Sequence, residues 1–435
     1  MKHRLSRLLL AATAAIGLAT ALPAMAKEIP PYNPALKVTI TYYNYNLASA
    51  GIGKEATELL INEFMAKYPN ITVQGVPVPA TDMTTRVQAD IVAGRVPDVT
   101  QMIFNDLDHA VTNLGVQALE DIVPAGEWRE HTQGMVPAGL KLAAINGKTY
   151  GIPYVFSTPV LFYNADLFRA AGLDPDKPPR TWAELKAASL AIKQKTGKEG
   201  FSTAAYDQFD WLRQSIVLSN GGRTLSEDRK RVMIGEAGAV GAYQMLRDLV
   251  ESGAHTRSAA SDAADAMRSG NMGMYLQTSA YTRVLMTGSA GKWDLRAAKM
   301  PAFGDKPTQP TNSGSGLFIH AKDPQKQRAA WELMKYMTSE RGYTVITEKI
   351  GYLPLRLNIV DDPQYLGNFV KATPLIRPNL EQLANLKPWE SMPGPNYKQI
   401  QRIEQGAVEQ AVFGTGDVAT IMMDAQKRAQ ALMPK

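Results

Sequence analysis

A regular alternation of short apolar strands with amphipathic helices is the feature that most constrains the fold of this chain. Segments rich in β-branched and aromatic residues predict strands at 36–46, 71–78 and 99–104. Between them, apolar residues recur at helical spacing, which predicts helices at 53–70 and 81–98. Strands that alternate with helices of this length are typical of a parallel sheet covered by helices, so we expect an α/β fold.

The same alternation returns in the second half of the chain. Thr181 is a good helix N-cap, Glu184 follows three residues later, and Gly197 ends the helical pattern. Further helices are expected at 239–253, at 323–340 and from residue 396 onward, with a strand at 313–322. No stretch has the composition of one flexible linker between domains. We therefore expect two α/β lobes between which the chain passes more than once.

One passage between the lobes is expected just after a hairpin. The Asn-Gly pair at 146–147 is a hairpin turn signal, because type I′ turns need positive φ at both central residues. Pro153 and Pro159 cannot donate to a β-ladder, so the segment that holds them lies at a sheet edge or leaves the sheet. Ser157 and Thr158 then lie at the passage itself, where their hydroxyls can face a cleft.

Residues 1–26 have the layout of a secretory signal peptide. A basic start is followed by an apolar run and by small residues that place a cleavage site after Ala26. The alternative is an uncleaved membrane anchor, but the apolar run is shorter than the roughly 20 residues that a spanning helix needs. We therefore expect a protein that is exported and freely soluble in a periplasm.

The composition excludes several classes of protein. The chain has no cysteine, which excludes a disulfide framework, thiolate metal sites and the lipid anchor that is built on a cysteine after the signal. The formal charge of +6 falls to about +3 when Lys2, Arg4 and Arg7 leave with the signal peptide. A charge this small gives no indication of a nucleic-acid partner.

Several motifs together resemble one protein family. They lie at 94–99 (GRVPDV), 146–153 (NGKTYGIP), 157–185 (STPVLFYN followed by AGLDP and PPRTW), 313–319 (SGSGLFI) and 350–356 (IGYLPLR). The chain resembles the extracellular solute-binding proteins of ABC importers, the family that includes maltose-binding and glycerol-3-phosphate-binding proteins. The resemblance covers essentially the whole chain after the signal peptide, and the likeness is greatest to the glycerol-3-phosphate-binding members.

This resemblance implies two α/β lobes that close like a hinge around a ligand in the cleft between them. The N-lobe would comprise 27–155 and 300–348, and the C-lobe 156–299 and 349–435. It also implies a monomer that delivers a small polar solute to the membrane permease subunits of the importer, without a cofactor.

Four residues match ligand-binding positions of the glycerol-3-phosphate-binding relatives. Ser157 matches a serine of the crossing strand, Gly314 a glycine before the return strand, and Tyr352 the tyrosine of a GYLP turn. Arg402 matches an arginine that holds phosphate, and arginine is suited to this role because its fork binds two oxygens at once. The alternative for Arg402 is an ordinary exposed helical arginine.

Other candidate positions depart from those relatives. Tyr45 and Asn46 stand in place of a Trp-His pair, Asp82 in place of a tyrosine, and Asn105 near the position of a glutamate. Tyr45 follows a strand at the sheet edge where open α/β sheets place ligands, although it could instead pack within the lobe. The ligand groups that these side chains contact are therefore expected to differ.

Three further residues complete the candidate site. Trp211 could stack on a sugar face, and its alternative is a core tryptophan. Thr278 and Ser279 follow an apolar run at a position where the relatives have a ligand-contacting serine, and their alternative is a solvated loop.

Two classes of solute stay open at this point. Arg402 favours glycerol 3-phosphate or a glycerophosphodiester, whereas the departures at Asp82 and Asn105 favour a neutral sugar, oligosaccharide or sugar alcohol. A secreted glycoside hydrolase is the enzymatic alternative. The histidines lack metal spacing, no G-x-S-x-G motif occurs, and Leu142 stands where a phosphate loop would need glycine. We therefore expect a binding protein with no catalytic residues and no metal.

Overall fold

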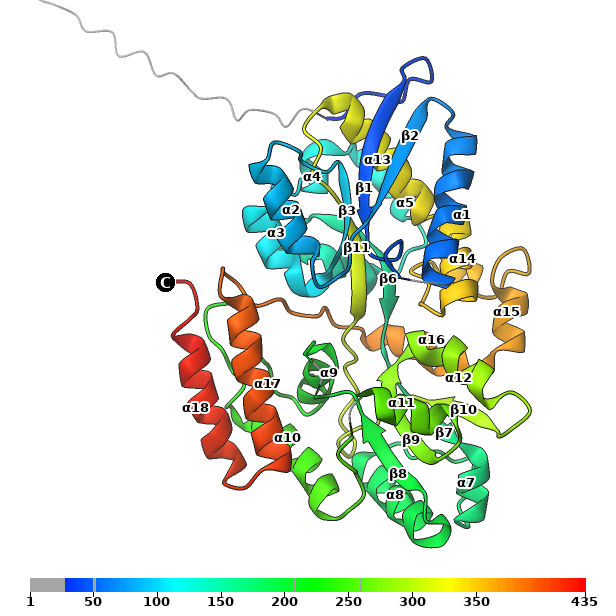
Figure 1. The fold of residues 1–435 in the computed structure, drawn as a ribbon, viewed down its shortest axis with the longest axis vertical. Helices are drawn as coiled ribbons and strands as arrows, with labels where there is room; N and C mark the ends of the chain where they lie inside the picture. Colours follow the sequence, from blue (N-terminus) through cyan, green and yellow to red (C-terminus); the bar gives the residue numbers. More distant parts are fainter. Residues whose placement is uncertain (1–27, 50–51, 207, 259) are drawn as a thin grey trace, which may run out of the picture.

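The computed structural model describes residues 28–49, 52–206, 208–258 and 260–435. The signal peptide expected at 1–26 lies outside the described residues. Figure 1 shows two α/β lobes, one above the other, each built around its own sheet. The expected two-lobe α/β architecture is therefore confirmed.

The N-lobe contains a five-stranded sheet in the order β2-β1-β3-β11-β6. Its strands are β1 (Val38–Asn44), β2 (Ile71–Pro77), β3 (Val99–Ile103), β6 (Gly151–Ser157) and β11 (Ser313–Ile319). The pairs β1–β2 and β1–β3 are parallel, but β11 is antiparallel to both β3 and β6. The three strands of the first alternation are therefore parallel as expected, and the sheet as a whole is mixed because β11 enters the lobe at the edge where β1 and β3 end.

Helices cover this sheet on both sides. Helix α13 packs on β1 and α1 on β2, and α14 packs against α1 (Figure 1). The helices of this lobe are α1 (Ile52–Lys67), α2 (Met83–Val92), α3 (Leu107–Asn113), α4 (Leu119–Ile122), α5 (Ala125–Thr132), α6 (Pro137–Leu140), α13 (Pro324–Met337) and α14 (Glu340–Ile350).

The expected hairpin is present between β4 (Ala144–Ile145) and β5 (Lys148–Thr149). Asn146 and Gly147 have φ angles of 50° and 79°, as a type I′ turn requires.

The C-lobe contains a four-stranded sheet in the order β10-β7-β9-β8. Its strands are β7 (Pro159–Asn164), β8 (Glu199–Thr203), β9 (Met272–Thr278) and β10 (Leu295–Ala298). Only β8 and β9 pair in parallel, since β7 arrives from the other lobe and runs antiparallel to β9 and β10.

The helices of the C-lobe include most of those expected from the sequence. In α8 the Thr181 hydroxyl accepts a hydrogen bond from the Glu184 amide at 3.2 Å, and Gly197 has φ of 67°. The helices are α7 (Ala165–Ala170), α8 (Trp182–Thr196), α9 (Trp211–Ser219), α10 (Ala237–Glu251), α11 (Ala260–Arg268), α12 (Thr282–Ser289), α16 (Arg377–Gln382), α17 (Tyr397–Phe413) and α18 (Val418–Gln430).

The chain passes between the sheets at three places. Strand β6, at the edge of its sheet, leads directly into β7 through Ser157 and Thr158, as the two prolines predicted. The segment between β10 and β11 returns the chain to the N-lobe. After α14 the chain stays in contact with the N-lobe, because Leu353 donates to Phe156 O at 2.9 Å. The chain contacts the C-lobe sheet again at Pro374–Ile376, which packs on β10, and at α16, which packs on β7 and β10, while the N-lobe contacts extend past residue 349.

A pair of buried charges joins helix α17 to helix α9. Glu404 on α17 and Arg213 on α9 are both fully buried, with 3.5 Å between Arg213 Nε and Glu404 Oε1. Burial raises the pKa of Glu404 to about 7, and the arginine opposes this shift. The pair fixes which face of α17 points toward the N-lobe. In the part of the chain that the structure describes, no helix is long and apolar enough to span a membrane.

Candidate ligand-binding cleft

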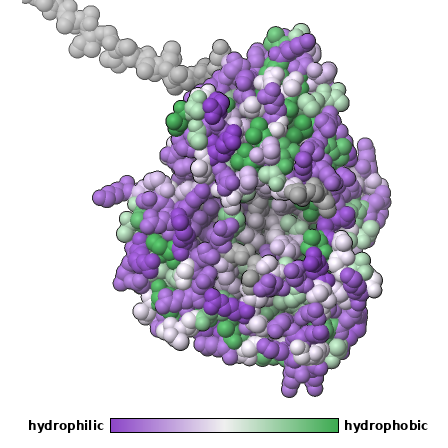
Figure 2. All heavy atoms as spheres, viewed as in Figure 1, coloured by the Kyte–Doolittle hydropathy of each residue, from purple (hydrophilic) through white to green (hydrophobic). Residues whose placement is uncertain are grey.

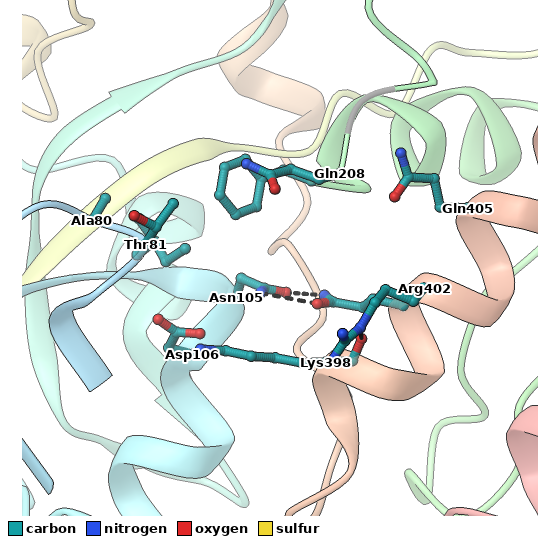
Figure 3. A pocket seen from close by; sticks show the side chains of 11 residues that line it. Ala80, Thr81, Asn105, Asp106, Gln208, Lys398, Arg402 and Gln405 are labelled. Carbon is teal, nitrogen blue, oxygen red and sulfur yellow. Dashed lines mark hydrogen bonds between the residues drawn. The ribbon is translucent and has the colours of Figure 1, made fainter. Parts of the chain in front are cut away.

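A cavity of about 320 Å³ lies between the two lobes and is called the interlobe pocket below. Figure 2 shows the surface hollowed where the lobes meet, and Figure 3 shows the side chains around the pocket. Its lining residues are Ala80, Thr81, Ile103, Asn105 and Asp106 from the N-lobe and Gln208, Phe209, Lys398, Gln401, Arg402 and Gln405 from the C-lobe.

Two structural features bring these lining residues together: the end of a strand and one face of a helix. Asn105 and Asp106 directly follow β3, and the carboxyl ends of parallel strands are where open α/β sheets bind ligands. Lys398 and Arg402 lie four residues apart on α17, and Gln401 and Gln405 also lie four apart, so all four share one helical face. The pocket thus joins a sheet edge of one lobe to a helix face of the other (Figure 3).

Asp106 brings a carboxyl group into this pocket. The Tyr397 hydroxyl donates to Asp106 Oδ1 at 2.7 Å, and Figure 3 shows the Lys398 side chain extending toward Asp106. Burial raises the pKa of Asp106 to about 6, although the hydrogen bond from Tyr397 and the charge of Lys398 oppose this shift. Asp106 is therefore ionised at pH 7.5 and largely neutral at pH 5.

Lys398 and Arg402 supply positive charge to the same pocket. Lys398 Nζ donates to the Thr84 hydroxyl at 3.1 Å, and Arg402 Nε donates to the Lys398 carbonyl at 3.2 Å. Neither acceptor is a carboxylate, and Arg402 is exposed at the rim of the pocket. The two cations thus keep donor capacity for an anionic ligand.

Polar contacts already join the lobes around the pocket. Asn105 and Gln401 form an amide pair, with 3.2 Å from Asn105 Nδ2 to Gln401 Oε1 and a second bond in the opposite direction (Figure 3). Farther along α3, Asp108 accepts from Arg229 Nη2 of the C-lobe at 2.9 Å. Because the lobes can separate only if these bonds break, the bonds favour the closed arrangement.

Tyr45, Tyr352 and Ser315 meet near the middle of the sheet edge. Burial raises the pKa of Tyr45 well above its usual range, and its hydroxyl interacts with those of Tyr352 and Ser315. The neighbouring Gly314 has φ of 114°, and a Cβ there would lie 2.1 Å from the Val155 carbonyl oxygen. Only glycine fits this position without strain, because both its backbone conformation and its close approach to β6 exclude a side chain.

A group of hydroxyls and one amide surrounds the passage from β6 to β7. This crossing cluster consists of Ser157, Thr158, Thr278, Ser279 and Asn379. Thr278 Oγ1 donates to Ser157 Oγ at 2.5 Å, Thr158 Oγ1 donates to Asn379 Oδ1 at 2.7 Å, and the Ser279 amide donates to the Thr158 carbonyl at 3.1 Å. The structure thus brings Ser157, Thr278 and Ser279 together, and their contact with a ligand stays a prediction.

The remaining predicted site residues are outside the lining of the interlobe pocket, although Asp82 lies next to its lining residue Thr81. Asp82 is exposed just before α2, where it accepts from the Thr81 hydroxyl at 3.1 Å. Asn46 is buried after β1, and its Nδ2 has no partner among the described residues. Trp211 is the first residue of α9 and is buried in the hydrophobic core, outside the lining of the interlobe pocket. Contact of any of these residues with a ligand stays a prediction.

The sequence prediction missed several pocket residues. Lys398 and Gln405 lie four and three residues from Arg402 on α17, so helical spacing from Arg402 could have identified them, and Gln401 lies four residues from Gln405 on the same side of the helix. Gln208 had no such signal, because nothing in its neighbourhood along the chain shows that it lies beside α17 in the fold.

Two α/β lobes, repeated passages between them and a polar pocket at their boundary define a two-lobe binding protein that encloses a small ligand. The family of bacterial extracellular solute-binding proteins matches residues 60–378. The chain belongs to this family.

Relatives of known name are distant in sequence and cover most of the chain. The sn-glycerol-3-phosphate-binding periplasmic protein UgpB of Yersinia pseudotuberculosis is 22% identical over 404 residues, which is 88% of this chain and 90% of the relative. UgpB of Brucella melitensis is 24% identical over 301 residues, or 66% of this chain and 68% of the relative.

Solved structures share the fold. The cyclic α-maltosyl-1,6-maltose binding protein of Arthrobacter globiformis has a TM-score of 0.79 at 21% identity and covers 91% of this chain and 99% of its own. UgpB of Mycobacterium tuberculosis in complex with glycerophosphocholine has a TM-score of 0.78 at 21% identity, with 91% and 98% covered. At these identities the likeness shows the fold and leaves the solute open.

Proposed function

We propose that this protein is the periplasmic solute-binding component of an ABC importer and that its solute is glycerol 3-phosphate or a glycerophosphodiester. The observation that carries the proposal is the pair of cations, Lys398 and Arg402, on the helix face that lines the interlobe pocket. A guanidinium fork and a nearby ammonium suit phosphate oxygens, and neither cation is paired to a carboxylate through its hydrogen bonds.

The distance between the ends of β3 and β6 along the sheet edge supports a solute larger than phosphate alone. Ile103 at the end of β3 pairs with Ser315 on β11, and Ser313 on β11 pairs with Ser157 at the end of β6. Two strand spacings separate β3 from β6, which is about 10 Å. A glycerophosphodiester is long enough to reach from the pocket to the crossing cluster along this edge.

Binding would close the lobes around the solute. The amide pair of Asn105 and Gln401 and the ion pair of Asp108 and Arg229 join the two lobes at the pocket side. Closure would exclude water from the phosphate contacts, which strengthens them, and would present a combined surface of both lobes to the permease. Export by the signal peptide at 1–26, action as a monomer and binding without catalysis are part of the same proposal.

A neutral sugar is the second candidate, and Asp106 favours it. An ionised carboxylate at the pocket repels a phosphate but accepts hydrogen bonds from sugar hydroxyls. The amides of Asn105, Gln208 and Gln405 suit hydroxyls as well, and Phe209 offers an apolar ring.

Thermal unfolding in the presence of glycerol 3-phosphate, glycerophosphocholine and maltose tests the proposal. A free ligand at 100 times its Kd stabilises the folded protein by about 2.7 kcal/mol, which raises the melting temperature measurably. We expect a rise with the two phosphates that Arg402→Ala abolishes. A rise with maltose alone would replace the phosphate proposal with the sugar one. If no importable solute raised the melting temperature, the binding proposal itself would be wrong.

A further inference from the structure

We propose that a second cavity between the lobes, called the basic groove below, is a docking site for an acidic peptide segment of a partner protein. The groove has a volume of about 1010 Å³. The lining residues that matter most are Arg268, Arg283, Val284 and Lys292 from the C-lobe and Lys349 and Ile350 from the N-lobe. The inference rests on the proposed importer function only in identifying the partner as the permease.

The basic groove is separate from the interlobe pocket. The two cavities share no lining residue. In Figure 1, helix α17, which lines the interlobe pocket, lies on one side of the crossing strand β6, and helices α12 and α14 lie on the other side. A partner bound in the groove therefore does not compete with a solute for the residues of the pocket.

Both lobes contribute to the wall of the basic groove. Arg283 lies on α12 of the C-lobe, and Lys349 lies in the last turn of α14 of the N-lobe. Gly351 ends α14 with φ of 99°, and a Cβ at this position would lie 3.5 Å from Arg283 Cγ. The stem of Arg283 thus lies against the end of α14, and a segment bound in the groove contacts both lobes at once.

The C-lobe wall of the groove is firmly built. A Cβ at Gly288 of α12 would collide with the side chain of Arg268 of α11, so the arginine stem lies directly across α12. Arg268 Nη2 lies 2.9 Å from Asp265 Oδ1, and Trp293 Nε1 donates to the Arg268 carbonyl at 3.4 Å. The two helices therefore present the arginine in a fixed position, and little freedom is lost when a partner binds.

Positive charge in the groove exceeds what the fold itself uses. Arg283, Lys292 and Lys349 are exposed, and none of them forms an ion pair with a carboxylate of the described residues. The alternative role of the cations is to stabilise the ends of α11, α12 and α14, since each helix C-terminus carries about half a negative charge. Four cations outweigh these three ends and the one lining carboxylate, so the surplus attracts acidic groups.

The size and lining of the groove select a peptide segment as the occupant. The groove has about three times the volume of the interlobe pocket, so one small anion would not fill it. Val284, which is 49% exposed, and Ile350 add apolar surface beside the cations. A chain segment with acidic and apolar side chains can enter such a groove, whereas the flat headgroup layer of a membrane would meet only its rim.

Binding at this groove is expected to depend on the arrangement of the lobes. Because the wall belongs to both lobes, a hinge motion changes the spacing between Lys349 and Arg283. A partner that binds one arrangement better shifts the protein toward it, and the solute and the partner then affect each other's affinity by the same factor. The permease would thus recognise the loaded protein through this groove.

Fluorescence anisotropy with a labelled hexaglutamate peptide tests the docking site on the full exported chain. Binding should be measurable at about 10 mM salt and weaken strongly at about 150 mM, because the Debye length falls from about 30 Å to about 8 Å. Labelled hexaglutamine, which has the same length and no charge, should not bind. Arg283→Ala and Lys349→Ala should each weaken hexaglutamate binding about threefold at low salt, although the two residues belong to different lobes.

Lys427→Ala is the matched control. Lys427 is exposed in the last turn of α18, as Lys349 is in the last turn of α14, but α18 packs on α10 and α17 instead of lining the groove. Its removal should leave hexaglutamate binding unchanged. An equal loss in Lys427→Ala, or no loss in Arg283→Ala and Lys349→Ala, would overturn the docking site. Binding of phosphatidylglycerol vesicles without binding of hexaglutamate would replace the peptide with a membrane and overturn it as well.

A parallel titration with glycerophosphocholine separates the failure of this inference from the failure of the proposed solute. If glycerophosphocholine binds and hexaglutamate does not, the docking site is wrong and the proposed solute stands. If hexaglutamate binds with the expected losses and glycerophosphocholine does not bind, the proposed solute is wrong and the docking site stands.

Discussion

The interlobe pocket and the crossing cluster lie along the same sheet edge but differ in charge and burial. The pocket contains Lys398, Arg402 and Asp106, and part of it is exposed at the rim. The crossing cluster contains only neutral groups, and Asn379 within it is fully buried. The pocket is assembled from two lobes that can separate, whereas the cluster lies where the chain itself joins them.

This difference has a physical reason. Charges at a boundary that opens are solvated while the lobes are apart and lose water only when a ligand arrives with the opposite charge. Charges buried permanently at the crossing would need a permanent partner, whereas neutral hydroxyls and amides need only hydrogen bonds. The difference teaches that this fold places charged side chains at the boundary between the lobes and neutral, hydrogen-bonded ones where the chain crosses.

The largest effect should come from a change beside the crossing. Gly314→Ala should lower the free energy of unfolding by about 3–5 kcal/mol, because the residue has positive φ and a Cβ would meet the Val155 carbonyl oxygen at 2.1 Å. Urea unfolding measures this change. Gly406→Ala on α17 is the control, since a Cβ there meets nothing within 4 Å and should stabilise the protein by about 0.5–1 kcal/mol. Equal urea midpoints for Gly314→Ala and the native protein would show that a Cβ at position 314 is accommodated without loss of stability, and would contradict this prediction.

A smaller effect, on binding alone, is expected at the pocket. Arg402→Ala should weaken glycerophosphocholine binding about 10- to 100-fold, because it removes charge-assisted hydrogen bonds to phosphate, and should leave stability nearly unchanged. Calorimetric titration gives the affinity. Arg428→Ala on α18 is the matched control. The Arg428 side chain is 61% exposed, and its Nη1 lies 3.9 Å from Asp424 Oδ2 in a surface ion pair. Comparable losses in both variants would mean that the effect of Arg402 is only a change in net charge.

The affinity for the solute should change about fivefold between pH 7.5 and pH 5. The direction of this change distinguishes a phosphate-containing solute from a sugar. Burial raises the pKa of Asp106 to about 6, so its carboxyl group is ionised at pH 7.5 and neutral at pH 5. Glycerophosphocholine keeps one negative charge on its phosphodiester over this range, so its affinity should rise about fivefold as the pH falls, because repulsion disappears. A sugar that donates to the carboxylate should instead lose affinity as the pH falls.

Asp106→Asn checks the assignment of this pH dependence. The amide cannot ionise, so the variant should bind glycerophosphocholine with nearly the same affinity at pH 5 and pH 7.5. A pH dependence that survived in this variant would assign the titration to another group.

The smallest effect is expected at the contact that joins the lobes. Gln401→Ala removes the amide pair with Asn105 and should weaken solute binding about threefold, since a neutral hydrogen bond contributes about 0.5–1.5 kcal/mol. The radius of gyration from small-angle scattering should increase in the unliganded variant. Gln399→Ala lies on the same helix at an exposed position and should change neither quantity. If Gln401→Ala tightened binding, the amide pair would be an obstacle to the solute.

Much of the fold could be predicted from local patterns. The cap at Thr181 and the hairpin at 146–147 were correct, because both depend on interactions within a few residues. The directions of β11 and β7 could not be predicted from local patterns, since direction depends on where a strand enters its sheet from the other lobe.

The candidate site was predictable to the extent that it follows strand ends and helix faces. Ser157 and Thr278 are the last residues of β6 and β9, and Ser279 follows directly, so strand ends at the lobe boundary bring these three residues together. Asn379 lies in a short helix far along the chain, and only the folded structure places it beside Thr158.

The structure of the protein bound to glycerophosphocholine would test the central claim most directly. We predict phosphate oxygens about 2.7–3.2 Å from the side-chain nitrogens of Arg402 or Lys398. A phosphate bound elsewhere in the protein, or a solute that touches neither cation, would contradict the proposal that the interlobe pocket binds the phosphate.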